Sequence, residues 1–178
     1  MAVTKETGLI QIYTGDGKGK STAAFGLALR ATGCGLKTVI IQFMKKGEWY
    51  GEVEAFAKLP EIELFSFGCD GFVKKGAPPP ADHLQQAQAA LAKSRQILID
   101  GQADLLILDE LNNAVYFDLV SQQEVEYLLA LKPSHMELVI TGRNAPDYLL
   151  QAADLVTEMR EIKHPYQRGL PARRGIEY

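Results

Sequence analysis

Cysteine is scarce in this sequence. Cys34 and Cys69 are the only two cysteines among 178 residues, which is too few for a disulfide framework. They also lack the clustered partners that a zinc site needs. We therefore interpret both as reduced thiols of a cytoplasmic protein.

Long apolar runs and an excess of positive charge are also missing. Residues 1–8 contain no apolar run of signal-peptide length, and no stretch reaches the ~18 apolar residues that span a bilayer. The formal net charge is −3, from 19 basic and 22 acidic residues, which argues against bulk neutralisation of nucleic-acid phosphates. We predict a cytoplasmic protein with no membrane and no nucleic acid as partner, in which an anionic ligand needs a specific site.

The remaining composition, with 47% hydrophobic and 23% charged residues, is that of an ordinary globular protein. Short apolar runs alternate with helix-length segments, which predicts a single α/β domain over residues 1–178. Its mainly parallel sheet of about six strands should carry helices on both faces, because several runs lack polar alternation. The expected strands are Leu9–Thr14, Thr38–Met44, Ile62–Ser66, Leu105–Asp109, Leu138–Thr141 and Leu155–Glu158. The expected helices are Ser21–Thr32, Ala81–Asp100, Ser121–Leu131 and Pro146–Ala153.

One segment, Phe67–Pro80, fits neither a helix nor a strand. It contains three glycines and three consecutive prolines, so we predict a long irregular loop of the kind that is usually functional or mobile. The three histidines, His83, His135 and His164, lie far apart without metal-ligand spacing, and we predict that none is a ligand.

The most informative segment is residues 10–22, IQIYTGDGKGKST. An apolar strand leads into a glycine-rich turn and then a helix, so backbone N–H groups, the helix N-terminus and Lys20 can hold phosphates. The ending Gly19-Lys20-Ser21 fits the phosphate-loop pattern G-x-x-x-x-G-K-[ST], but Thr14 stands where that pattern has its first glycine. The alternative is an accidental glycine-rich turn. We favour a nucleoside triphosphate as the ligand.

A second apolar strand, residues 105–108, ends in two acids, Asp109 and Glu110. In phosphate-loop proteins a carboxylate at this position completes the Mg²⁺ shell, directly or through water. Acids at a strand end are also common on surfaces, so this interpretation depends on the phosphate loop.

Seven motifs spread over nearly the whole chain resemble one known family. They are residues 14–24 (TGDGKGKSTAA), 28–33 (ALRATG), 42–45 (QFMK), 108–111 (LDEL), 140–143 (ITGR), 163–164 (KH) and 175–178 (GIEY). The series resembles the ATP:cob(I)alamin adenosyltransferases of cobalamin biosynthesis and corrinoid salvage. The resemblance implies a P-loop, RecA-like fold and a transfer of the 5′-deoxyadenosyl group of ATP to cob(I)alamin or a related corrinoid, with release of triphosphate.

The same resemblance implies partners and cofactors. It implies Mg²⁺ (or Mn²⁺), a homodimer, and an electron donor such as a flavoprotein that keeps the cobalt reduced. Because a reduced metal centre is the nucleophile, no general base is needed.

The resemblance also assigns roles to individual residues. Lys20 and Phe72 are expected to be catalytic, with Phe72 covering the corrinoid, although it could instead be a loop anchor. Ser21 and Glu110 are expected to hold the metal, with Asp109 behind or in place of Glu110. The expected nucleotide-binding residues are Gly15, Asp16, Gly17, Lys18, Gly19, Lys20, Ser21, Thr22 and Arg30.

Two departures from the family concern the corrinoid side. Lys74 stands where relatives can have a tryptophan, and little chain precedes the first strand, so this side is expected to be open or closed by another subunit. Trp49 and Tyr50 either line it or pack at a helix start, and Arg143 is either functional or a surface arginine. Two rival functions remain open, a plain P-loop ATPase or kinase and a non-catalytic ATP- or corrinoid-binding protein.

Overall fold

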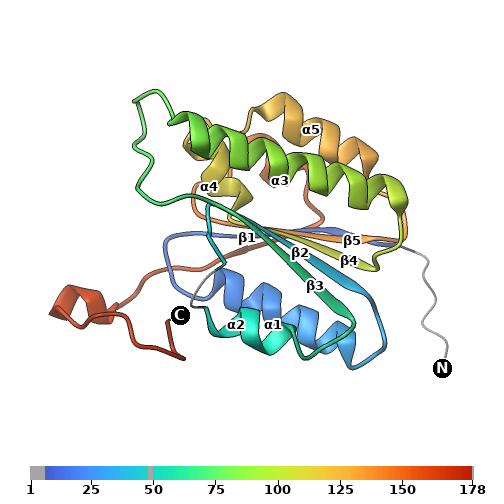
Figure 1. Cartoon of the computed structure of the whole chain (residues 1–178), viewed down its shortest axis with the longest axis horizontal. Helices are drawn as coiled ribbons and strands as arrows, with labels where there is room; N and C mark the ends of the chain where they lie inside the picture. The colour runs from blue at the N-terminus through green and yellow to red at the C-terminus, as the bar shows by residue number, and fades with distance from the viewer. Residues whose placement is uncertain (1–6, 48–49, 178) are drawn as a thin grey trace.

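A computed structural model describes residues 7–47 and 50–177. Six strands form one sheet in the order β3-β2-β4-β5-β1-β6, and every neighbouring pair is parallel (Figure 1). This confirms the α/β class and makes the sheet fully rather than mainly parallel. The strands are β1 Ile10–Thr14, β2 Thr38–Phe43, β3 Ile62–Phe67, β4 Leu105–Asp109, β5 Glu137–Thr141 and β6 Leu155–Glu158.

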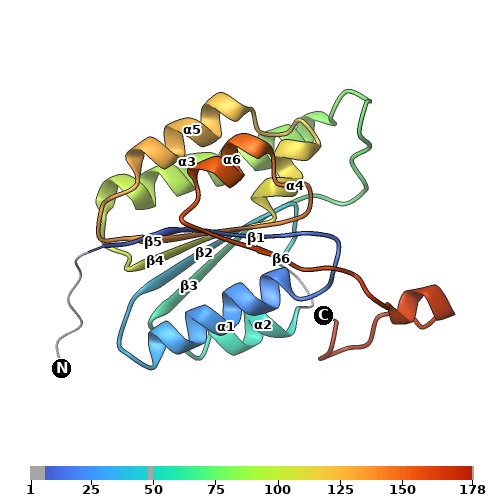
Figure 2. The same cartoon turned by 180° about the vertical axis from the view of Figure 1, so that it is seen from behind.

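Helices cover both faces of the sheet, as the continuous apolar runs predicted. α1 and α2 lie on one face, and α3, α4, α5 and α6 lie on the other (Figures 1 and 2). Every residue of β2 and of β4 is buried, which explains why these strands contain almost no polar alternation. The helices are α1 Lys20–Thr32, α2 Gly51–Phe56, α3 Ala81–Asp100, α4 Leu111–Tyr116, α5 Gln122–Leu131 and α6 Asp147–Ala152, and a 3₁₀ helix, η1, spans Pro165–Arg168.

The long helices begin and end close to the positions that the sequence predicted. α1 ends before Gly33, α3 ends before Gly101 in a left-handed conformation, and Ser121 caps α5 in a complete capping box with Glu124. Three short helices, α2, α4 and η1, were not predicted from the sequence, and each has six residues or fewer. Helices this short depend on tertiary packing and not on propensity.

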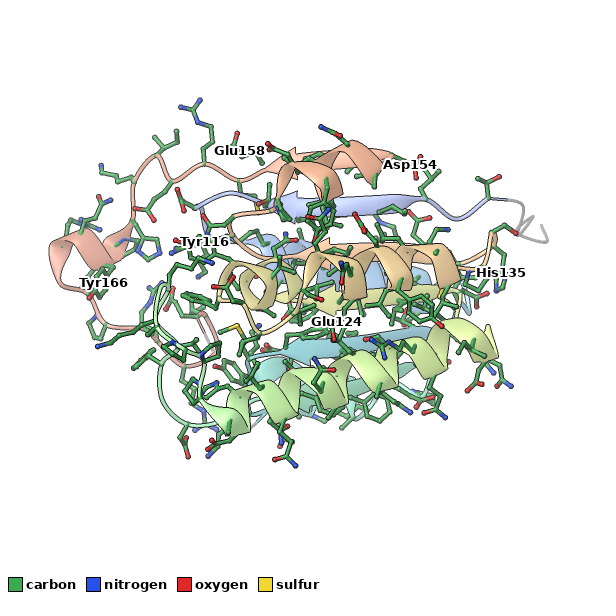
Figure 3. The ribbon with its side chains drawn as sticks, turned by 90° about the horizontal axis from the view of Figure 1, so that it is seen from above. Tyr116, Glu124, His135, Asp154, Glu158 and Tyr166 are labelled. Atoms are coloured by element: carbon green, nitrogen blue, oxygen red, sulfur yellow. The ribbon has the colours of Figure 1, made fainter. Side chains whose placement is uncertain are left out.

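Two segments extend from the edge of the sheet where the strands end. Phe67 is the last residue of β3, and residues 68–80 contain no helix or strand, as predicted for this loop. An arm follows β6, extends past Glu158 to Tyr166 on η1, and then returns toward the loop between β1 and α1 (Figures 1 and 3). Among the described residues, none of the helices is both long and apolar enough to cross a membrane.

Candidate functional site

The turn between β1 and α1 has the backbone that a phosphate loop requires. Gly15 and Gly19 have φ angles of 92° and 118°, a left-handed region that favours glycine. A Cβ on Gly15 would lie 2.4 Å from the carbonyl oxygen of Met159, and one on Gly17 would lie 2.8 Å from backbone atoms of Met159 and Arg160. These glycines therefore let the loop pack directly against the chain that follows β6.

The displaced first glycine has a simple explanation. Thr14 is the last residue of β1 and pairs with Glu158 in β6, so the turn starts one residue later, at Gly15. The Thr14 hydroxyl accepts a hydrogen bond from the backbone N–H of Ala145 at 3.3 Å, and the Gly17 N–H donates to the Met159 carbonyl at 2.7 Å. The loop is thus held from two neighbouring segments.

Lys20, at the start of α1, is buried, with 8% of its surface exposed. Its ammonium donates to the carbonyl oxygen of Gly17 at 2.6 Å. Burial and the charge of Arg143 lower the pKa of Lys20, while Glu110 and Asp16 act to raise it. A cation held inside the loop in this way suits a ligand with several negative charges.

The two acids after β4 have different surroundings. Asp109 is fully buried, whereas Glu110 has a φ of 64° and contacts the side-chain amide of Asn113. The Glu110 N–H donates to the Thr141 hydroxyl at 3.0 Å. Burial and the nearby charge of Asp109 raise the pKa of Glu110. A half-buried carboxylate on a strained backbone is typical of a functional site.

A cavity of about 790 Å³ lies in front of the loop, within the usual range for small-molecule sites. Of the residues predicted to bind nucleotide or metal, those that line it are Asp16, Gly17, Lys18, Gly19, Lys20, Ser21, Thr22 and Glu110. The lining does not include Gly15, Arg30, Phe72 or Asp109. The structure thus brings most of the predicted loop residues and Glu110 together around one cavity. The roles of all these residues stay predictions.

Ser21, on α1, and Glu110, directly after β4, both line this cavity. Two oxygen ligands of this kind suit Mg²⁺, which usually keeps several waters and takes its other ligands from substrate phosphates. Within residues 7–47 and 50–177, no group of three or more His, Cys, Asp or Glu side chains is arranged to hold a metal. The cavity therefore fits a metal that arrives with a phosphate ligand better than a metal held by the protein alone.

The C-terminal arm contributes lining residues that the sequence analysis did not assign. The Lys18 ammonium donates to the Glu177 carboxylate at 3.0 Å and to the Ile176 carbonyl at 3.1 Å. The Glu177 carboxylate also accepts hydrogen bonds from the backbone and side chain of Arg173. The tail thus lies against the phosphate loop, 159 residues away in sequence. Tyr178, the last residue of the GIEY motif, falls outside the described residues.

Arg143 and Lys45 also line the cavity. The Arg143 guanidinium donates to the Asp16 carbonyl at 3.1 Å, and a functional role for Arg143 stays a prediction. Lys45 had no role predicted from the sequence, although its position shortly after the end of a buried strand was a signal. Tyr50 precedes α2 and lines the cavity too, whereas Trp49 lies outside the described residues.

Phe72 projects from the irregular loop and is 94% exposed. The neighbouring Val73 is buried in the core, so Val73 anchors this loop and Phe72 does not. Arg30 is exposed in the last turn of α1. Phe72 and Arg30 are therefore accessible from solvent, and neither belongs to the cavity wall.

The histidines make local contacts. The Nε2 atoms of His83 and His135 lie 3.2 Å and 3.1 Å from the backbone carbonyls of Asp70 and Gly101. His164 accepts a hydrogen bond from the Tyr166 N–H at the start of η1 and lines the cavity.

A parallel sheet whose first strand and first helix are joined by a glycine-rich loop that ends in Gly19-Lys20-Ser21 is typical of the P-loop class of α/β proteins. Within this class, comparison with known proteins points to one family. The family described as ATP:corrinoid adenosyltransferase BtuR/CobO/CobP matches residues 6–178. The chain is 37% identical over 178 residues to a corrinoid adenosyltransferase from Sinorhizobium sp., covering 98% of this chain and 82% of that one.

Two further relatives carry related names. A corrinoid adenosyltransferase from Pseudomonas aeruginosa is 35% identical over 97% of this chain and 85% of its own length. Corrinoid adenosyltransferase CobA from Salmonella typhimurium is 36% identical over 98% of this chain and 87% of its own length. The chain therefore belongs to the ATP:corrinoid adenosyltransferase family.

Proposed function

We propose that this protein transfers the 5′-deoxyadenosyl group of ATP to the Co(I) centre of a reduced corrinoid and releases inorganic triphosphate. The observation that carries the proposal is the phosphate loop, which opens onto a cavity of about 790 Å³ in a chain of the ATP:corrinoid adenosyltransferase family. Family membership supports the substrates, and the loop supports the leaving group.

The reaction needs no base from the protein. The cobalt donates an electron pair to the 5′ carbon of ATP, the bond from that carbon to oxygen breaks, and its electrons leave with the triphosphate. The protein must therefore bind the triphosphate and stabilise the charge that it gains. We assign this task to Lys20, Lys18, the N–H groups of the loop and the N-terminus of α1, and the position of both lysines in the cavity lining supports the assignment.

We place the divalent cation, Mg²⁺ or Mn²⁺, between Ser21 and Glu110. Bound there, it would supply positive charge to the triphosphate. The Ser21 hydroxyl and the Glu110 carboxylate would orient it, and the fixed backbone of Glu110 would limit how far its carboxylate moves. Gly15 and Thr22 would complete the phosphate cradle, and Asp16 and Arg30 would lie near the nucleoside end.

On the corrinoid side, we propose that Phe72 covers the substrate. Its side chain is almost fully exposed on a loop that is anchored through Val73, so its apolar surface is available to a large planar ligand. Phe72 would also push away the lower axial ligand of the corrinoid. The four-coordinate Co(II) that results is easier to reduce to Co(I). Lys74 is exposed as well and offers no ring to extend this cover.

The decisive experiment incubates the protein with ATP, Mg²⁺ and chemically reduced cobalamin. We expect a light-sensitive cobalt–carbon bond and stoichiometric triphosphate. Orthophosphate alone, formed without corrinoid, would identify a plain ATPase, and binding of both ligands without turnover would identify a carrier. Either result contradicts the proposal.

Three further proposals follow from membership of the family. The protein would act as a homodimer, would receive electrons from a donor such as a flavoprotein, and would work in the cytoplasm. Light scattering tests the first, and adenosylation of cob(II)alamin with a reduced flavoprotein in place of chemical reductant tests the second. Cell fractionation tests the third.

A further inference from the structure

Lys45 reaches the phosphate-binding region from outside the phosphate loop. It follows β2, and its ammonium lies 2.7 Å from the Asp109 carboxylate and 3.5 Å from the Ser21 hydroxyl. The rings of Phe25 and Tyr50 lie 5.8 Å from the same ammonium. The side chain is 17% exposed, so it is held between the loop, an acid and two aromatic rings while it lines the cavity.

The backbone before Lys45 adopts a conformation that serves this placement. Met44 has a φ of 59°, which costs roughly 1–3 kcal/mol for a residue with a side chain and persists only where surrounding contacts impose it. At this turn the backbone of Met44 and Lys45 lies beside Gly68, which follows β3, and the Lys45 side chain reaches Asp109 at the end of β4. The strain at Met44 is therefore offset by contacts nearby, among which is the buried ion pair of Lys45.

Asp109 is already engaged by groups of the protein. Its Oδ1 atom accepts from the Thr141 hydroxyl at 2.6 Å, and its Oδ2 atom accepts from Lys45 and, at 3.3 Å, from the Gln42 amide. The residue is fully buried and does not line the cavity. A carboxylate surrounded in this way orients an ammonium, whereas the adjacent Glu110 faces the cavity.

Lys45 has a counter-charge in these surroundings. Its ammonium lies 2.7 Å from the fully buried Asp109 carboxylate, which is the pairing that a buried cation requires. The ammonium also lies beside the hydroxyl of Ser21, the residue at which we place the metal and the phosphates.

We propose that Lys45 is a triphosphate-binding residue and that Asp109 is a positioning residue, which holds the Lys45 ammonium and does not ligate the divalent cation. The proposal deepens the proposed function, because it assigns a third lysine to the leaving group. A phosphate oxygen near the Ser21 hydroxyl would lie within reach of Lys45, and a charge-assisted hydrogen bond there would be strong.

The first test measures binding of inorganic tripolyphosphate, in the presence of Mg²⁺ and without corrinoid, by titration calorimetry. Lys45→Met should weaken binding about tenfold or more, and Lys45→Arg should restore most of the affinity because it keeps the charge. Affinity of Lys45→Met within about threefold of the unmutated protein, a difference below 1 kcal/mol, overturns the proposal.

The second test separates a positioning role of Asp109 from metal ligation. If Asp109 acts through Lys45, Asp109→Asn should weaken tripolyphosphate binding in the unmutated protein and have no further effect in Lys45→Met. The Mg²⁺ concentration for half-maximal binding should rise in the matched control Glu110→Gln and stay unchanged in Lys45→Met/Asp109→Asn relative to Lys45→Met. A rise in that double variant would make Asp109 a metal ligand and refute its assignment.

The double variant also guards against misfolding. Lys45→Met alone leaves a buried carboxylate without its cation, which is strongly destabilising, whereas Lys45→Met/Asp109→Asn removes both charges. The binding measurement on the double variant therefore tests Lys45 even if the single variant unfolds. The binding test contains no corrinoid, so a negative result for Lys45 does not change the outcome of the adenosylation assay. Conversely, if adenosylation is not observed, tripolyphosphate binding still tests the role of Lys45.

Discussion

One hydroxyl group connects both acids of the candidate site. The side chain of Thr141, fully buried at the end of β5, donates to Asp109 Oδ1 at 2.6 Å and accepts from the Glu110 N–H at 3.0 Å. Thr141→Val keeps the shape of the side chain but removes both hydrogen bonds. A buried carboxylate oxygen and a backbone N–H then lose a partner.

Each group left unsatisfied costs about 1–3 kcal/mol, so Thr141→Val should lower the free energy of unfolding by roughly 3 kcal/mol. For a chain of this size, about 2–4 °C are lost per kcal/mol, which predicts a fall in Tm of about 6–12 °C. Urea unfolding followed by circular dichroism measures the free energy, and a thermal melt gives the Tm. Tripolyphosphate binding should weaken as well, because Glu110 loses the bond that fixes its backbone.

The chain offers a matched control for this substitution. Thr38, at the start of β2, is 1% exposed, and its hydroxyl has no hydrogen-bond partner among the described residues. Thr38→Val should therefore leave the free energy of unfolding unchanged or raise it. Thr141→Ser, which keeps the hydroxyl, should retain most of the stability that Thr141→Val loses. If the Thr141→Val and Thr38→Val proteins unfold within about 0.5 kcal/mol of each other, the reasoning is wrong.

Three other predictions concern the loop, the corrinoid side and the tail. A Cβ on Gly17 would lie 2.8 Å from backbone atoms, so Gly17→Ala should reduce tripolyphosphate affinity at least about tenfold in calorimetry, and an unchanged affinity would contradict the packing argument. Phe72→Ala should slow adenosylation of cob(II)alamin while ATP binding is retained; equal loss of both would argue against a corrinoid role. Hydrogen bonds from Arg173 and Lys18 lower the pKa of Glu177 to about 2, so the contact between tail and loop should persist above the ordinary glutamate range and disappear as pH falls toward 2. Carboxyl NMR titration should show this midpoint, and a midpoint near 4.3, the ordinary value, would contradict it.

The sequence predicted the sheet well because buried parallel strands carry a strong local signal. The runs that became β2 and β4 are apolar on both faces, and the glycines at 15 and 19 occupy turn positions that favour glycine. The strand order was not predictable in the same way. It depends on which strands pair after the helices pack, and the sequence shows no local trace of that choice.

Two residues of the site show the consequence. Lys45 meets Asp109 only because β2 pairs with β4 in a register that sets Gln42 beside Asp109. Glu177 meets Lys18 only because the arm after β6 returns across the loop. Long-range contacts of this kind cannot be predicted from the spacing of residues in the sequence. The positions of Glu110 and Ser21 at the cavity could be predicted, because each lies directly at the end of its own strand or loop.

Two of the four described non-glycine residues with positive φ angles lie where these contacts form. Met44 follows the last residue of β2, Glu110 follows the last residue of β4, and both have positive φ angles. A residue with a side chain holds such a conformation only when its surroundings impose it. The Lys45–Asp109 ion pair stabilises the strained backbone at Met44. At Glu110, the hydrogen bond from its N–H to Thr141 does so, and the residue lines the cavity. The adjacent acids therefore differ in their surroundings: Asp109 is buried and pairs with a cation of the protein, whereas Glu110 lines the cavity, where we propose that it receives the divalent cation.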